Sequence, residues 1–184
     1  NMIAADLAQP MIVVMPLGYG LPDARTRAPE MLSPGTDQRA VMHEFGAGLI
    51  EEVLPFVERQ YRTRTDPAGR AIAGFSMGGS QALAIGLSRP DIFATVASFS
   101  GAFIMFGFQY EPWFGDVESA VTQRITISVG ADDFLVPTNR HLTTWLRERG
   151  LDFSFDVVPG AHSMQVGRRE LIRLLPNLFR SHER

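Results

Sequence analysis

The sequence has 184 residues, a net charge of −3 and no cysteine, with 45% hydrophobic and 20% charged residues. This length and composition favour one globular domain over residues 1–184 with a substantial core, and no apolar run approaches the ~20 residues of a membrane span. Scattered basic residues argue against a nucleic-acid partner, and the lack of cysteine excludes disulfides, thiolate metal sites and cysteine nucleophiles.

The first third of the chain predicts a strand, a loop and a long helix. Residues 10–16 form an apolar run between two prolines, which is typical of a strand buried on both faces. Residues 17–35 are rich in glycine, proline and polar residues and predict a loop. Apolar residues recur at four-residue steps over residues 37–61, which predicts a helix with one buried stripe. Pro55 is expected to kink or restart that helix.

Strands and helices alternate in the rest of the chain. The predicted strands cover residues 71–75, 94–99, 125–129 and 153–158, and the predicted helices cover residues 77–87, 138–149 and 166–180. This alternation predicts an α/β fold with a doubly wound, mostly parallel sheet.

One segment, residues 101–116, breaks the alternation and is too aromatic for an ordinary exposed loop. We interpret it as a cap or loop insertion in the single domain. Its aromatic residues, including Phe103, Phe106 and Trp113, are candidates to line an acyl or aromatic substrate pocket. The alternative is a hydrophobic flap that only covers the core.

The residues around Ser76 carry the strongest functional signal. Gly74-x-Ser76-x-Gly78 is the G-x-S-x-G pattern of a nucleophile elbow, with an apolar strand before it and a helix after it. The two glycines are expected because strand and helix pass close together there. Ser76 is therefore the candidate nucleophile. The amide of Met77, at the positive end of the following helix, is the candidate oxyanion donor.

A serine hydroxyl needs a general base, and the base needs a group that holds its tautomer. In this type of fold the chain order is serine, acid, histidine. His162 follows the last predicted strand, whereas the other histidines fall on helices or in the tail. Asp132 and Asp133 both follow the preceding strand, and the local pattern does not choose between them.

Several motifs together resemble the putative esterase (esterase D) family, in its feruloyl-esterase-like branch of the α/β-hydrolase superfamily. They are residues 10–16, 54–58, 70–79, 130–133 and 160–162. The resemblance implies that the acid is the fourth residue of Gly-x-x-Asp, which is Asp133. It also implies a serine carboxylic-ester hydrolase that forms an acyl-enzyme with feruloyl or short acyl esters, uses neither cofactor nor metal, and takes small-molecule or polysaccharide-linked substrates.

The chain departs from the family pattern at its front. The strands that precede the segment matching Asn1 are absent, together with a His-Gly loop that supplies the second oxyanion amide. One missing strand would lie between residues 10–16 and residues 71–75. The sequence is then a fragment, half of a complex, or a variant whose own N-terminal part closes the gap differently. We favour an incomplete copy of an esterase, which predicts an exposed apolar sheet edge and hence self-association or a partner chain.

Location and alternative functions stay open. The first residues lack the pattern of a signal peptide, so the protein is either cytosolic or begins after a removed segment; the family resemblance alone favours an extracellular or periplasmic site. An acyltransferase of the same fold would differ only in passing the acyl group to an alcohol. A catalytically impaired, hydrolase-like interaction module is the third possibility, because one oxyanion donor is missing.

Overall fold

A computed structural model describes residues 2–18, 36–115 and 117–180. The chain divides into two compact units, one of Asn1–Met11 with Asp66–Arg184 and one of Ile12–Thr65. Each unit is treated by itself below. The organisation of residues 1–184 as one domain stays a prediction.

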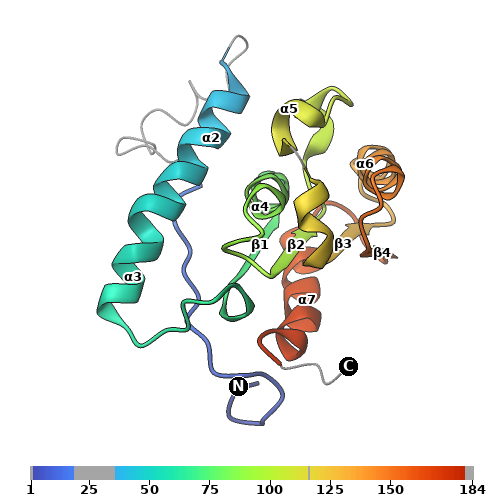
Figure 1. Ribbon diagram of the computed structural model, residues 1–184. Helices are drawn as coiled ribbons and strands as arrows, with labels where there is room; N and C mark the ends of the chain where they lie inside the picture. The colour runs from blue at the N-terminus through green and yellow to red at the C-terminus, as the bar shows by residue number, and fades with distance from the viewer. Residues whose placement is uncertain (1, 19–35, 116, 181–184) are drawn as a thin grey trace. The chain divides into compact units, whose positions relative to one another are not determined.

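The helical region of the Ile12–Thr65 unit is interrupted just before its proline. Helix α2 (Gln38–Gly48) is followed by one π-helical turn (Leu49–Val53) and by α3 (Leu54–Gln60), as Figure 1 shows. The Leu54 amide donates to the Leu49 carbonyl five residues back, instead of four. Pro55 lies in the first turn of α3, directly after the π-helical turn. The expected break at Pro55 is therefore a change in hydrogen-bond spacing.

The predicted strand at residues 10–16 is wrong. Residues 9–17 have no regular secondary structure, and the side chains of Val13 and Met15 are 62% and 87% exposed. Apolar β-branched residues favour a strand only where a neighbouring strand accepts and donates the backbone hydrogen bonds. No described strand pairs with this segment. Most of the loop predicted over residues 17–35 lies outside the described residues.

The larger unit contains a parallel four-stranded sheet. Its strands are β1 (Ala71–Phe75), β2 (Thr95–Phe99), β3 (Arg124–Gly130) and β4 (Phe153–Val158), in the order β1-β2-β3-β4. In the register, Gly74 lies opposite Ser98, and Ser98 lies opposite Ile127. All pairs are parallel, so the carboxyl ends of the strands meet at one edge. The predicted α/β fold and the four strands from residue 71 onward are confirmed.

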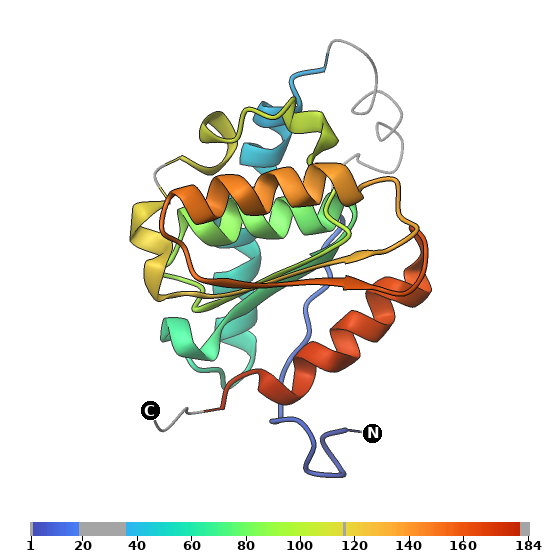
Figure 2. The same cartoon turned by 90° about the vertical axis from the view of Figure 1, so that its right-hand side faces the viewer.

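Helices cover both faces of this sheet. Figure 2 shows α4 (Met77–Ser88) and α6 (Val136–Glu148) on one face and α7 (Met164–Leu174) on the other. Helix α4 packs tightly, because a Cβ on Gly86 would lie 2.6 Å from a side-chain methyl of Val96 on β2. The terminal helix ends earlier than expected and continues as a short 3-10 turn (Leu175–Asn177) that contains Pro176.

The aromatic segment between β2 and β3 forms a packed layer. It includes the short helix α5 (Glu111–Phe114), and its rings contact one another and Trp145 of α6. The ring of Phe106 stacks on Trp113, with centroids 4.1 Å apart. Glu111 fastens the segment, since its carboxylate accepts hydrogen bonds from the Trp145 indole at 2.9 Å and from the Arg149 guanidinium.

Strand β1 has a strand neighbour on only one side among the described residues. It carries no charged side chain, whereas β4, at the other edge of the sheet, carries Asp156. The edge of β1 is the sheet edge that the family resemblance led us to expect. Association of the chain through this edge stays a prediction. None of the described helices is long and apolar enough to cross a membrane.

Candidate active site

Ser76 occupies the turn between β1 and α4 in a strained backbone conformation. Its φ and ψ angles are 56° and −120°, a region that non-glycine residues rarely enter. Its amide donates to the Phe99 carbonyl at 2.9 Å, and its carbonyl accepts from three amides, those of Gly79, Ser80 and Ala102. The surrounding strand and helix thus hold the serine in this conformation.

The crowding beneath the serine differs in part from the expectation. A Cβ on Gly74 would lie 2.0 Å from the Gly78 carbonyl oxygen, so position 74 must be glycine. A Cβ on Gly78 would meet nothing within 4 Å. The second crowded position is Gly79, whose Cβ would lie 2.8 Å from the Ser98 hydroxyl oxygen. The expectation that Gly78 must be small is therefore wrong, because its α-carbon faces open space.

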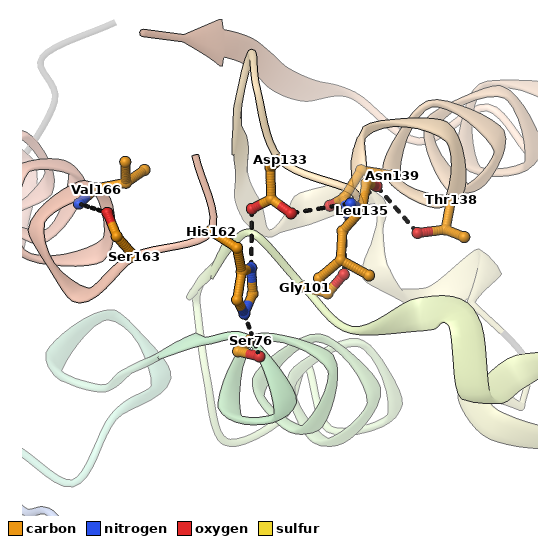
Figure 3. Close-up of polar contacts among 9 residues, drawn as sticks. All are labelled: Ser76, Gly101, Asp133, Leu135, Thr138, Asn139, His162, Ser163 and Val166. Carbon is orange, nitrogen blue, oxygen red and sulfur yellow. Dashed lines mark hydrogen bonds and ion pairs between the residues drawn. The ribbon is translucent and has the colours of Figure 1, made fainter. Parts of the chain in front are cut away.

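The loops after β3 and β4 bring an acid and a histidine to Ser76. The Nε2 atom of His162 lies 2.9 Å from the Ser76 hydroxyl oxygen, and its Nδ1 atom lies 2.9 Å from a carboxylate oxygen of Asp133. Figure 3 shows the three side chains in this connected row. An ionised carboxylate only accepts, so Nδ1 carries the proton and Nε2 is free to accept the serine proton.

Burial and hydrogen bonding separate the two neighbouring aspartates. Asp133 is only 4% exposed, and its second carboxylate oxygen accepts from the Leu135 amide at 2.9 Å. Asp132 is exposed, and its amide donates to the Gly160 carbonyl at 3.0 Å. The backbone of Asp132 therefore joins the two loops, while the side chain of Asp133 reaches the histidine.

Two supporting residues were not anticipated from the sequence. Asn139 is fully buried on α6, and its amide donates to the carbonyls of Leu135 and Gly101, which ties the acid loop to the loop after β2. Phe75 stacks on the imidazole of His162, with centroids 4.9 Å apart. An asparagine six residues after Asp133 and an aromatic residue inside G-x-S-x-G were the available signals.

Met77 begins α4, so its amide has no acceptor within the helix and lies beside the nucleophile position. This is the arrangement that an oxyanion donor requires. No group of three or more potential metal ligands occurs in the described part of the chain.

The structure places the three predicted pocket residues in the aromatic layer. Phe103 and Phe106 are 0% and 3% exposed, and Trp113 is half-buried against Phe106. This burial favours the flap interpretation for the two phenylalanines. Their role in substrate binding, like that of Trp113, stays a prediction.

The parallel sheet, the strained serine after its first strand and the acid and histidine after later strands define an α/β-hydrolase fold of the esterase class. The chain belongs to the family described as "Putative esterase", whose model matches residues 2–178. The family resemblance drawn from the motifs is thereby confirmed.

Named relatives agree with this membership. The chain is 34% identical over 105 residues to an endo-1,4-beta-xylanase/feruloyl esterase of Xylanibacter ruminicola, covering 57% of this chain. It is 44% identical over 52 residues to Esterase Rv1288 of Mycobacterium tuberculosis, covering 28% of this chain. These matches span 13% and 11% of the two curated relatives.

A solved structure extends the likeness in fold over nearly the whole chain. It is that of a ferulic acid esterase from Anaeromyces mucronatus in complex with ferulic acid, with a TM-score of 0.76 and 21% sequence identity. The match covers 97% of this chain and 69% of the other.

Proposed function

We propose that this chain is a serine carboxylesterase that hydrolyses feruloyl or other short acyl esters through an acyl-enzyme. The observation that carries the proposal is the unbroken hydrogen-bonded row from Ser76 through His162 to Asp133. The names of the feruloyl esterase relatives support the substrate class.

Acylation begins when the Ser76 oxygen attacks the ester carbonyl carbon and Nε2 of His162 takes the serine proton. The negative charge that develops on the former carbonyl oxygen is stabilised by the Met77 amide and by the positive end of α4. Asp133 stabilises the imidazolium. His162 then donates its proton to the alcohol oxygen as the carbon–oxygen bond breaks, which leaves the acyl group on Ser76.

Deacylation repeats these steps with water. The oxygen of the water molecule attacks the acyl carbon while His162 accepts a proton from that water. The bond to Ser76 breaks, the serine recovers a proton from His162, and the free acid leaves. An acyltransferase would follow the same route with an alcohol in place of water.

The backbone of Ser76 argues for an enzyme over an interaction module. A residue in such a conformation costs on the order of 1–3 kcal/mol, and such strain concentrates at active sites. A module that only bound a partner would gain nothing from a strained serine whose hydroxyl contacts a histidine.

A fluorophosphonate probe tests the nucleophile. We expect one label on the native chain, none on Ser76→Ala, and full labelling of Ser88→Ala, which removes an exposed serine at the end of the same helix. Equal labelling of the native chain and Ser76→Ala would overturn the assignment of the nucleophile.

A panel of methyl ferulate and short-chain acyl esters tests the reaction. We expect release of free acid that depends on Ser76. Failure of a chain that labels with the probe to turn over any ester would contradict the hydrolase proposal. Preferential transfer of the acyl group to an added alcohol would identify the acyltransferase.

A further inference from the structure

An exposed phenylalanine lies directly beside the histidine of the site. Phe134 follows Asp133 and is 68% exposed, although a large apolar side chain gains most by burial. The centroid of its ring lies 5.0 Å from that of the His162 imidazole, with 57° between the ring planes. Most of the Phe134 ring therefore remains open to solvent next to the candidate general base.

The two rings that contact His162 have different surroundings. A Cβ on Gly167 of α7 would lie 2.7 Å from the Phe75 ring, so that ring is held closely between the histidine and a helix. Phe134 lies in the loop between β3 and α6, and much of its surface has no protein neighbour. Phe75 is packed so that it supports the imidazole, whereas the exposed ring of Phe134 is free to contact a ligand.

The chemistry of the site assigns a part of the substrate to this face. His162 must give its proton to the alcohol oxygen of the ester, which brings that oxygen within hydrogen-bonding distance of Nε2. The acyl carbon, in contrast, bonds to Ser76, and its oxygen lies toward the Met77 amide. A ring that contacts the imidazole and is open to solvent is a candidate contact for the alcohol part of the ester.

We propose that Phe134 determines specificity for the alcohol part of the ester, by packing against an alcohol whose ring presents an apolar face. Aryl alcohols and sugars share this property. The inference rests on the proposed esterase function and names which half of the substrate Phe134 contacts.

Three ferulate esters with different alcohols test the proposal, namely the methyl ester, the benzyl ester and the ester of a methyl glycoside. We expect Phe134→Ala to lower kcat/KM for a ring alcohol by roughly 3- to 10-fold, the range of a lost ring contact. The methyl ester should change less than about 2-fold, because it has no ring to lose. A loss on only the benzyl or only the glycoside ester identifies which kind of ring is recognised.

The rate of deacylation separates specificity from support of His162. All three esters form the same acyl-enzyme after the alcohol has left, so Phe134→Ala should leave the release of ferulate from that intermediate unchanged. A slower release, or an equal loss with all three esters, would overturn the proposal and make Phe134 a positioning residue for His162.

Two further variants complete the experiment. Phe134→Tyr keeps the ring and should retain the preference for ring alcohols. Ile172→Ala removes an apolar side chain that is 49% exposed from α7, in the same compact unit as the site, and should leave all three kcat/KM values unchanged. Failure of the native chain to hydrolyse any ester would count against the esterase function itself, whereas a uniform effect of Phe134→Ala on an active enzyme counts only against this inference.

Discussion

A Cβ on Gly130 would lie 2.2 Å from the carbonyl oxygen of Gly160, so the loops after β3 and β4 meet in direct backbone contact. This contact joins the end of β3, three residues before Asp133, to the loop that carries His162. We expect Gly130→Ala to force the loops apart, to lower the free energy of unfolding by about 1–3 kcal/mol and to reduce ester hydrolysis further than stability alone explains.

Urea unfolding and kcat/KM on one ester measure both effects of Gly130→Ala. The matched control is Gly48→Ala, because a Cβ on Gly48 in α2 meets nothing within 4 Å. That variant should be as stable as the native chain or slightly more so. Full activity of Gly130→Ala would show that the loop contact does not position the site.

The two glycines of the G-x-S-x-G pattern should respond differently to substitution. Gly74→Ala places a methyl group 2.0 Å from the Gly78 carbonyl oxygen and should abolish labelling of Ser76 by a fluorophosphonate. Gly78→Ala adds its methyl group to open space and should label at the native rate. Loss of labelling in both variants would mean that both glycines are needed for a reason other than steric contact.

The neighbouring aspartates provide a matched pair for the role of the acid. Asp133→Asn should lower kcat by about 10⁴-fold, because the amide no longer holds the imidazole in the productive tautomer. Asp132→Asn changes an exposed side chain and leaves its backbone hydrogen bond in place, so kcat should stay near the native value. Equal losses of kcat, or a larger loss for Asp132→Asn, would show that Asp133 is not the acid.

Stability at alkaline pH should depend on Tyr110. Burial in the aromatic layer raises the pKa of Tyr110 to about 12 from its ordinary value of 10.0. Between these pH values the hydroxyl ionises in the unfolded chain but stays protonated in the folded chain. The contribution of protonated Tyr110 to the free energy of unfolding is therefore complete below pH 10 and is lost as the pH rises toward 12.

Denaturant unfolding of Tyr110→Phe measures this contribution. The variant lacks the hydroxyl that lies 3.1 Å from His141, so it starts less stable, but its stability should fall less between pH 10 and 12. Tyr61→Phe alters an exposed tyrosine and should keep the native slope. The same slope in Tyr110→Phe and the native chain would contradict the prediction.

The uncharged edge of β1 predicts concentration-dependent association of two copies of the chain, which sedimentation velocity would detect. Ala73 is the exposed residue of this strand, and Ala73→Lys should weaken association because a charge at an edge opposes strand pairing. Ser154→Lys on β4 is the control and should leave the association of the two copies unchanged. A monomer at all concentrations would refute the prediction.

Local patterns were sufficient for several features of this protein. The strand, the glycine pattern and the helix around Ser76 are contiguous, so the sequence alone predicted the nucleophile turn. The alternation of periodic segments also predicted the four parallel strands, because each strand and helix is signalled within its own residues. The chain order of serine, acid and histidine was also visible in the sequence, because each of these residues directly follows a predicted strand.

Features that depend on distant parts of the chain were decided only by the tertiary structure. The apolar run at residues 10–16 has the composition of a strand, but none of the described strands pairs with it, and hydrogen-bond partners are not a local property. The local pattern does not separate Asp132 from Asp133, and only the family resemblance favoured Asp133. In the structure the Asp133 carboxylate is buried and lies 2.9 Å from His162, whereas Asp132 is exposed. The sequence likewise did not indicate that the exposed ring of Phe134 lies beside the His162 imidazole, because the two residues come from different loops.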